Sequence, residues 1–299
     1  MQTLYDALVA AADSHPDHAF LAVPARAGRD YLPEGAELSF AQVRAAADAV
    51  ADQWAAQGWG IGHRVALALD NHPAHVVHFL AFARLGVMQI PVNPYYLDHE
   101  LRYLIDHGEP DAVVALPRHA DRLARAGAPA PVLVDPMQPL PGPAPVPAPP
   151  RPAMAGTPDR HTEIALIYTS GTTARPKGAL IDNDYAFAVG QMYATHGGAL
   201  TVRDGVERIF LPLPYFHVNA GVNTLCMALL KRICLIIPDR FHGDSWWDDI
   251  RATRATAFHY LGIIPPALMK APPSPHDRDH GLRYGLGAGI DPALHAAFE

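Results

Sequence analysis

Strand-like apolar segments alternate with helical ones along residues 1–116, and this alternation constrains the fold more than any other feature of the sequence. Asn71 and Asp98 precede two of the helical segments as predicted N-caps, and Gly86 is expected to end one of them. The expected strands are 64–69, 87–92 and 111–116, and the expected helices are 41–57, 72–85 and 100–107. Strands connected through helices pair in parallel, so the sequence predicts an α/β protein.

The second half of the sequence continues the alternation after a stretch rich in proline and alanine. That stretch, 129–160, is expected to be an extended connector between a first α/β subdomain, 1–128, and a second, 161–299. Ser245 and Asp291 are predicted N-caps. The expected strands are 207–213, 233–238, 255–261 and 282–288, and the expected helices are 184–195, 223–230, 246–251 and 292–298.

A segment of hydroxyl side chains, glycines and one lysine follows the strand-like run that ends at Tyr168. It reads Thr169-Ser170-Gly171-Thr172-Thr173-Ala174-Arg175-Pro176-Lys177-Gly178. Gly171 and Gly178 permit positive φ and close backbone approach, so several N–H groups can point at one anion. Lys177 is one of only three lysines in a chain with 23 lysines and arginines, which indicates a need for a compact ammonium group. The segment predicts a phosphate-binding loop; a solvated turn is the alternative.

The order of residues in this loop distinguishes between nucleotide-binding families. The P-loop of nucleotide triphosphatases places Gly-Lys-Ser/Thr four residues after its first glycine, and the residues after Gly171 do not match. Tyr-Thr-Ser-Gly-Thr-Thr-x-x-Pro-Lys-Gly instead resembles the signature of the adenylate-forming superfamily, which includes acyl-CoA synthetases, luciferase-like enzymes and peptide-synthetase adenylation domains. Ala174 departs from that signature, where most members have glycine.

The resemblance implies a fold for this chain and indicates how much of the family's fold the chain covers. It implies the layered α/β/α N-terminal domain of the adenylate-forming fold, with two predominantly parallel sheets. It also implies that the chain ends before the β-barrel part is complete and lacks the small C-terminal domain. The family segments expected after Glu299 supply a metal-side glutamate, a ribose-binding aspartate and a catalytic lysine. We therefore expect little adenylation by this chain alone, and completion by a partner chain or a homo-oligomer is an open possibility.

The resemblance also assigns roles to the loop. ATP is the implied nucleotide, Mg²⁺ the metal and CoA the co-substrate. The loop residues would hold the β- and γ-phosphates, with Lys177 as a catalytic cation and either Thr172 or Thr173 near Mg²⁺. The phosphate-binding set is Thr169, Ser170, Gly171, Thr172, Thr173, Lys177 and Gly178.

Two further segments carry expected site residues. An aromatic-histidine pair, Phe216-His217, follows a predicted strand, and the resemblance places it at the acyl pocket and the thiol tunnel. His217 would act between the half-reactions, whereas the alternative is a packed histidine bonded to a carbonyl. The small residues Gly287-Ala288-Gly289 are expected to pack against adenine, and a tight strand-to-helix turn is the alternative.

The favoured function is activation of a carboxylic acid to acyl-AMP followed by transfer to CoA. The segment 265–283 and Arg175-Pro176-Lys177 resemble the carnitine/crotonobetaine-CoA ligase branch, so a small carboxylic acid substrate of fatty acid or carnitine metabolism is expected. One alternative is a non-catalytic nucleotide-binding or interaction fragment. Another is a peptide-synthetase adenylation domain, although Asn219 stands where an aspartate for the amino group is usual.

The composition of the chain limits the classes of partner that we expect it to bind. The net charge is −7, so the overall balance does not favour nucleic acid or an anionic membrane. No apolar run approaches the length of a membrane span, and the two cysteines are expected to be buried free thiols, so a cytoplasmic location without stable membrane insertion is predicted. His72, His75 and His78 spread around a helix rather than converging, and no structural metal is expected.

Overall fold

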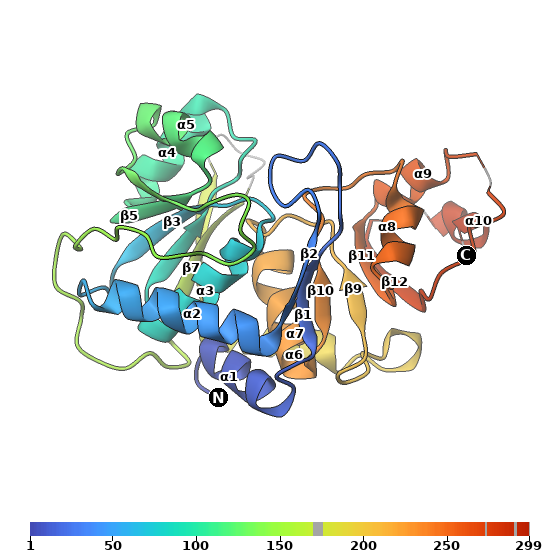
Figure 1. Ribbon diagram of the computed structural model, residues 1–299, viewed down its shortest axis with the longest axis horizontal. Helices are drawn as coiled ribbons and strands as arrows, with labels where there is room; N and C mark the ends of the chain where they lie inside the picture. Colours follow the sequence, from blue (N-terminus) through green and yellow to red (C-terminus); the bar gives the residue numbers. More distant parts are fainter. Residues whose placement is uncertain (170–175, 273, 290–291, 299) are drawn as a thin grey trace.

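The computed structural model describes residues 1–169, 176–272, 274–289 and 292–298, and two six-stranded sheets organise them (Figure 1). The first sheet has the order β6 (Pro131–Leu133), β5 (Ala112–Ala115), β3 (Arg64–Ala68), β4 (Met88–Pro91), β7 (Glu163–Thr169), β8 (Lys177–Asp182). The second has the order β12 (Tyr284–Ala288), β11 (Ala257–Leu261), β9 (Arg208–Phe210), β10 (Cys234–Ile236), β1 (Ala19–Val23), β2 (Ala36–Ser39).

Parallel pairing dominates both sheets, which confirms the expected α/β class. Of the strands that the structure describes, only β2 and β8 run antiparallel to their neighbours, and each is the last strand at one edge of its sheet. Each sheet also contains strands from before and after the proline-rich connector. The boundaries proposed for two subdomains remain a prediction.

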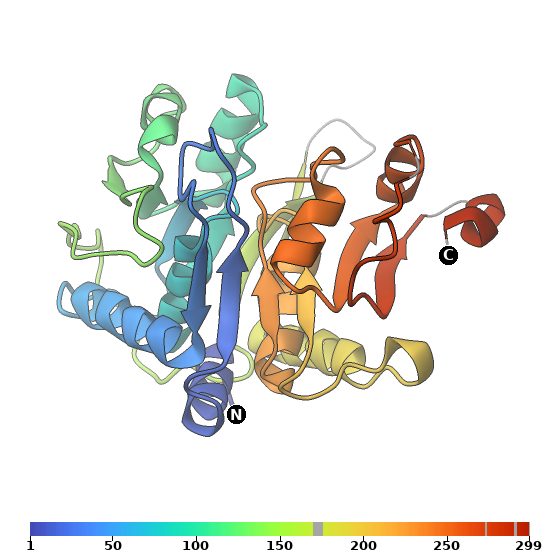
Figure 2. The same cartoon turned by 45° about the vertical axis from the view of Figure 1, so that its right-hand side comes forward.

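Helices cover both faces of each sheet and produce five layers (Figures 1 and 2). Between the sheets lie α1 (Leu4–Ser14), α2 (Phe40–Ala55), α3 (Pro73–Leu85), α6 (Asn183–Ala194) and α7 (Leu225–Lys231). On the outer face of the first sheet lie α4 (Asp98–Gly108) and α5 (Ala120–Arg125), and on the outer face of the second lie α8 (Trp246–Ala252) and α9 (Ile264–Leu268). The remaining described elements are the short 3₁₀ turns η1 (Pro117–His119), η2 (Gly198–Leu200) and η4 (Pro292–Leu294), the π-helical segment η3 (Asn219–Thr224), and α10 (His295–Phe298).

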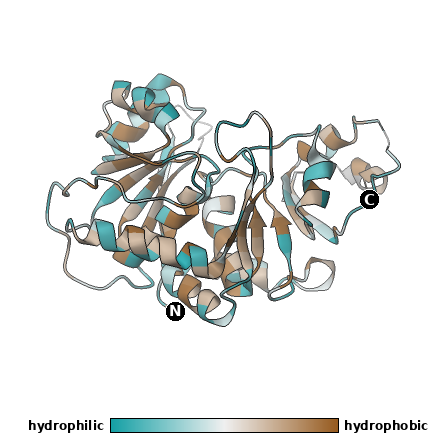
Figure 3. Cartoon of the chain, viewed as in Figure 1, coloured by the Kyte–Doolittle hydropathy of each residue, from teal (hydrophilic) through white to brown (hydrophobic). Residues whose placement is uncertain are grey.

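Alternation of side chains along the strands explains these layers. In β3, Val65 and Leu67 join the core between the sheets, whereas Ala66 and Ala68 face α4 and α5. A strand buried on both faces must be apolar at every position, and Figure 3 shows the apolar residues concentrated in the strands and the central helices. Within the described residues, no helix combines the length and the apolarity needed to cross a bilayer.

Several predicted helix ends are corrected by the structure. Gly86 does end α3 with a φ of 70°, but the N-cap of α3 is His72, whose Nδ1 accepts from the Ala74 N–H at 3.1 Å. Asn71 lies one residue earlier and binds other backbone groups. The N-cap of α4 is Leu97, because Asp98 is already the first helical residue.

The remaining two predicted caps have different outcomes. Ser245 lies at the N-cap position of α8, but its hydroxyl donates to Asp249 Oδ2 at 2.9 Å instead of accepting from a backbone N–H. Asp291 lies outside the described residues.

The proline-rich stretch 129–160 contains no helix, and most of its residues are exposed or half-buried. Its one strand, β6, has three residues and occupies the edge of the first sheet. Polar contacts fix its course: Trp59 Nε1 donates to the Pro147 carbonyl at 2.7 Å, and Arg151 forms an ion pair with Asp111 at 2.6 Å.

Candidate functional site

The ends of β7 and β8 carry the first predicted site residues. These strands form an antiparallel pair whose last partners are Thr169 and Lys177, and the Lys177 residue is exposed. Lys177 therefore places a compact positive charge at this end of the strand pair. Ser170, Gly171, Thr172 and Thr173 were predicted to bind phosphate between these two ends, and they lie outside the described residues.

Gly178 lies close against side chains of β7 and does not adopt an unusual backbone conformation. Two properties were expected of this glycine, positive φ and close approach, and its φ is not positive. It lies opposite Tyr168 in the strand pair, and a Cβ atom at this position would come within 2.8 Å of Leu166 Cδ1. The absence of a side chain at Gly178 therefore leaves room for the β7 side chains.

Gly287, Ala288 and Gly289 form an exposed end of β12. Gly287 pairs with Tyr260 of β11, and a Cβ atom on Gly287 would lie 2.5 Å from the Tyr260 carbonyl oxygen. Gly289 has a φ of 79°, which favours glycine. The largest side chain at this strand end is the methyl group of Ala288, which leaves the backbone open to a flat ring. The turn of the alternative interpretation would include residues outside the described part of the chain, so both interpretations stay predictions.

The segment after β9 places Phe216 and His217 differently. Phe216 lines a cleft, whereas His217 is exposed and is not among the cleft residues. Their rings are adjacent, with centroids 4.4 Å apart. Partial desolvation of the His217 ring lowers its pKa, which favours the neutral imidazole near pH 7. Among the described residues, desolvation is the one cause of this lowered pKa and no hydrogen bond of the His217 ring contributes to it; both interpretations of His217 stay predictions.

The cleft beside Phe216 has a volume of about 490 Å³ and lies where the carboxyl ends of strands from both sheets meet. Its lining residues are Arg29, Asp30, Tyr31, Asp70, Asn71, Pro94, Tyr95, Arg118, His119, Pro212, Pro214, Phe216, Asp239 and Arg240. They follow β1, β3, β4, β5, β9 and β10 in the chain. Because β7 is parallel to β4 and β12 is parallel to β11, Thr169 and Gly287–Gly289 lie at this same edge.

One side of the cleft is a cluster around Asp70, which sits between β3 and α3 with a φ of 51°. Its Oδ2 accepts from Arg118 Nε at 3.0 Å and lies 2.9 Å from His119 Nε2. Burial opposes ionisation of Asp70, but the hydrogen bonds and charges of His119 and Arg118 outweigh it and hold the pKa below its usual range. Asp70 is thus a half-buried carboxylate that orients two basic side chains at the cleft.

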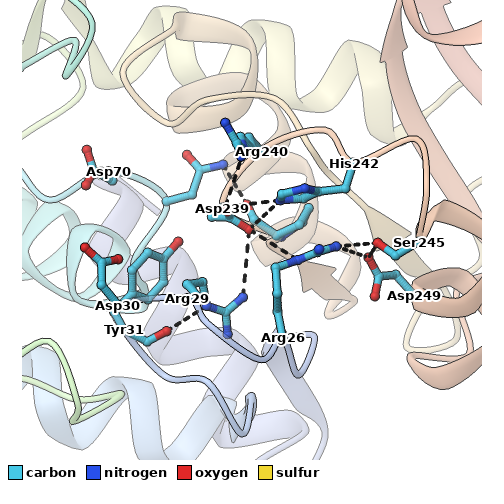
Figure 4. Close-up of polar contacts among 12 residues, drawn as sticks. Arg26, Arg29, Asp30, Tyr31, Asp70, Asp239, Arg240, His242, Ser245 and Asp249 are labelled. Atoms are coloured by element: carbon cyan, nitrogen blue, oxygen red, sulfur yellow. Dashed lines mark hydrogen bonds and ion pairs between the residues drawn. The ribbon is translucent and has the colours of Figure 1, made fainter. Parts of the chain in front are cut away.

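The opposite side is built on the loop between β1 and β2 (Figure 4). Arg29 is buried, and its guanidinium donates to the carbonyls of Tyr31 at 2.6 Å, Pro24 at 3.1 Å and Leu32. Asp239 lies 4.0 Å from Arg29 Nη1. These hydrogen bonds from one guanidinium to three backbone carbonyls hold the loop in place, so the loop forms a rigid wall of the cleft.

A second set of polar contacts connects this wall to α8. Arg26 bridges Asp239 at 3.9 Å and Asp249 at 3.0 Å, and His242 Nε2 lies 3.0 Å from Asp239 Oδ1 (Figure 4). The cleft itself is lined by three arginines and three aspartates, so its formal charges balance. The cleft is therefore polar, with charged side chains in defined orientations, rather than strongly cationic.

Sequence analysis did not predict this cleft, although it predicted Phe216. Its charged residues run from Arg29 to Arg240, a separation of 211 positions, and form no motif. The available signal was positional: Asp70, Arg118 and Asp239 each follow a predicted strand, where α/β folds place ligand sites. Lys177, Phe216 and Gly287 lie on segments that reach the same edge of the two sheets.

The histidines of α3 are buried and serve packing. His78 Nδ1 lies 2.8 Å from the Ala74 carbonyl, and the His75 ring stacks on Tyr215 at 5.5 Å. In the part of the chain that the structure describes, no group of three or more His, Cys, Asp or Glu residues is arranged to hold a metal. An Mg²⁺ bound through nucleotide phosphates does not need such a group.

Comparisons with known proteins agree with this architecture. The profile of the family described as "AMP-binding enzyme" matches residues 8–299. The crystal structure of the N-terminal domain of FACL13 from Mycobacterium tuberculosis superposes with a TM-score of 0.79 at 22% identity, covering 100% of this chain and 73% of that one. An ATP-bound RpMatB-BxBclM chimera superposes with a TM-score of 0.75 at 22% identity, covering 98% and 57%.

Curated relatives are acyl-CoA ligases by name. Sulfoacetate–CoA ligase of Cupriavidus necator is 27% identical over 99% of this chain and 57% of its own length. The medium/long-chain-fatty-acid–CoA ligase FadD6 of M. tuberculosis is 26% identical over 88% and 44%. Crotonobetaine/carnitine–CoA ligase of Salmonella paratyphi B is 24% identical over 83% and 49%. The chain thus spans about half the length of these relatives and matches their N-terminal portion.

Proposed function

The chain belongs to the family of AMP-binding enzymes, and from this premise we propose that it serves the ATP-dependent activation of a carboxylic acid and the transfer of the acyl group to CoA. A carboxylate oxygen attacks the α-phosphorus of ATP and pyrophosphate leaves, which gives acyl-AMP. The CoA thiol then attacks the acyl carbonyl, loses its proton and releases AMP. The carboxylate is already nucleophilic at neutral pH, so the first step chiefly needs positioning and charge stabilisation.

The observation that carries this proposal is the exposed Lys177 opposite Thr169 at the open end of the β7–β8 pair. In our proposal Lys177 neutralises the β- and γ-phosphates, and Thr169, Ser170, Gly171, Thr172 and Thr173 complete the loop around them. Mg²⁺ supplies further charge neutralisation when bound, with Thr172 or Thr173 on its side of the phosphates. The exposed Gly287–Gly289 surface, on the same sheet edge, fits the flat adenine ring.

We assign the acyl and thiol side of the reaction to the cleft beside Phe216. Its volume of about 490 Å³ suits part of a small molecule, and Phe216 supplies an apolar contact at its wall. His217 lies next to this ring and faces solvent, so it is placed to meet a group that approaches the cleft from outside. We propose that His217 acts between the two half-reactions.

The chemical class of the substrate is a small or medium carboxylic acid. The named relatives act on sulfoacetate, fatty acids and crotonobetaine or carnitine, which share only the carboxylate. The crotonobetaine branch remains our favoured specialisation because of the sequence of the loop and of residues 265–283.

A competition experiment tests the nucleotide part of the proposal. Mg-ATP is titrated into the purified chain by calorimetry, alone and with saturating pyrophosphate. The expected result is saturable ATP binding that pyrophosphate abolishes, because both use the β7–β8 loop. ATP binding that is insensitive to pyrophosphate would contradict the assignment of the loop.

The alternative of a nucleotide-binding module without turnover needs a separate readout. Pyrophosphate–ATP exchange is measured with crotonobetaine, sulfoacetate and octanoate. Carboxylate-dependent exchange would support activation of the acid by this chain. It would also contradict our prediction that the chain alone has little adenylation activity. ATP binding without exchange supports the binding module for the isolated chain.

A further inference from the structure

Three aromatic rings form a compact cluster where α4 crosses the β7–β8 pair. Tyr103 and His107 lie one turn apart on α4, and their rings stack with centroids 5.4 Å apart. Both meet Tyr168 of β7 edge-on, at 6.4 Å from Tyr103 and 5.6 Å from His107. The cluster lies directly beside the strand ends that carry Thr169 and Lys177.

The polar atoms of these rings hold both strand ends. Tyr103 Oη donates to the carbonyl of Pro176 at 3.1 Å, immediately before Lys177. His107 Nδ1 lies 2.7 Å from Tyr168 Oη, immediately before Thr169. One helix therefore contacts the incoming and the outgoing end of the loop through two side chains.

The helix is a rigid support for these contacts. Leu101, Leu104 and Ile105 are buried against the outer face of the first sheet. Gly108 permits close approach at the end of α4, because a Cβ atom there would lie 2.9 Å from Ile90 Cδ1 and 3.3 Å from Tyr168 Oη. Burial also raises the pKa of Tyr168 to about 12, so its phenol stays protonated for the hydrogen bond with His107.

We propose that Tyr103 and His107 are positioning residues that set the geometry of Thr169 and Lys177 for binding the β- and γ-phosphates. This inference rests on the proposed function, and neither side chain is assigned a contact with nucleotide. A strand end that neighbouring side chains already hold in place loses less conformational freedom when it binds an anion. Removing either contact should therefore weaken ligands that use the loop and spare those that do not.

The test uses calorimetry to compare variants in which one aromatic side chain is changed conservatively. Tyr103→Phe removes one hydroxyl, and His107→Phe keeps an aromatic ring but removes Nδ1. Tyr96→Phe is the matched control, because Tyr96 packs on the same apolar cluster and no hydrogen bond of its hydroxyl is present within the described residues. Mg-ATP, pyrophosphate and AMP are titrated into each protein, and melting temperatures are recorded.

The expected result is a loss of about three- to tenfold in affinity for Mg-ATP and pyrophosphate in Tyr103→Phe and His107→Phe, the range for one lost hydrogen bond. AMP affinity should stay within about twofold, as should all three affinities in Tyr96→Phe. Unchanged ATP affinity, or an equal loss for AMP, would overturn the proposal, since a merely structural role weakens every ligand alike.

Hydrogen exchange separates this inference from the proposed function. Peptides from the β7 and β8 strand ends should exchange faster in Tyr103→Phe than in Tyr96→Phe without any ligand. If the wild-type chain binds no nucleotide while this difference is present, the proposed function fails and the positioning contact stands. Identical exchange in the two variants would contradict the positioning contact itself.

Discussion

The side-chain oxygen of Asn71 accepts a hydrogen bond from the backbone N–H of Tyr215 at 3.0 Å. The Nδ2 group of Asn71 also donates to the carbonyls of Leu213 at 3.2 Å and Pro238 at 3.0 Å. Asn71 follows β3 of the first sheet, whereas its partners follow β9 and β10 of the second. One buried amide therefore joins the two sheets and fixes the segment that carries Phe216.

Replacing Asn71 with Ala should destabilise the protein strongly. Two carbonyls and one N–H would lose their partner in a buried position, at a cost of about 1–3 kcal/mol for each group left unpaired. We expect the free energy of unfolding in urea to fall by at least about 2 kcal/mol. Asn93→Ala is the control, because Asn93 caps only the exposed Tyr95 N–H; comparable losses in both variants would contradict the joining role.

Gly221 should tolerate no side chain. A Cβ atom there would lie 2.2 Å from the backbone carbonyl oxygen of Tyr215, so Gly221→Ala must displace the Phe216 segment. We expect a loss of about 1–3 kcal/mol in unfolding free energy, as for overpacked cores. Gly281→Ala, where the nearest atom is 3.8 Å away, should change little. Equal melting temperatures for the two variants would show that the segment moves without cost.

Acid should destabilise the fold through the buried histidines of α3. Burial lowers the pKa of His75 to about 3, below the value of about 6.5 in an unfolded chain. As pH falls from 7 toward 4, the unfolded chain gains a proton that the folded chain does not, so the unfolding free energy decreases. His72 and His78, with pKa values lowered to about 4, act in the same direction.

The variant His75→Leu should remove one part of this pH dependence. The loss of unfolding free energy between pH 7 and pH 5 should shrink by about 1–2 kcal/mol, measured by urea unfolding at both pH values. The replacement should cost little at pH 7, because neither ring nitrogen of His75 has a hydrogen-bond partner within the described residues. His99→Leu, at an exposed position, is the control. An unaltered pH dependence in His75→Leu would exclude this histidine as a source.

The two cysteines should be unreactive in the folded protein. Burial raises the pKa of both Cys226 and Cys234 to about 12, so almost no thiolate is present at pH 8. We expect no reaction with Ellman's reagent over minutes under native conditions and two thiols per chain in guanidinium chloride. Rapid native labelling of either thiol would contradict the burial of α7 or β10.

Much of the fold was predictable because it depends on local patterns. The α/β alternation, the end of α3 at Gly86 and the buried cysteines all follow from short-range sequence features. The caps were less predictable, because Asn71 is a good N-cap residue that instead satisfies three distant backbone groups. Tertiary hydrogen bonds of this kind leave no trace in local sequence.

The site was predictable only where it forms a motif. Lys177 and Phe216 were identified from short segments, whereas Asp70 and Arg118 acquire their roles from strands that meet in space. The sequence also left two uses for Gly178, positive φ and close approach, and it could not distinguish them, because a glycine that makes room for Leu166 looks the same in sequence as one with positive φ.

The central claim is that the β7–β8 hairpin of this chain binds the phosphates of ATP. The most direct test compares the Mg-ATP affinity of the Lys177→Ala variant with that of the Lys270→Ala variant. Both substitutions remove an exposed lysine, but only Lys177 lies at the hairpin end. We predict that Lys177→Ala weakens Mg-ATP binding about tenfold or more, the effect of losing one charged contact, while Lys270→Ala stays near wild type. Equal Mg-ATP affinity in the two variants would contradict the account.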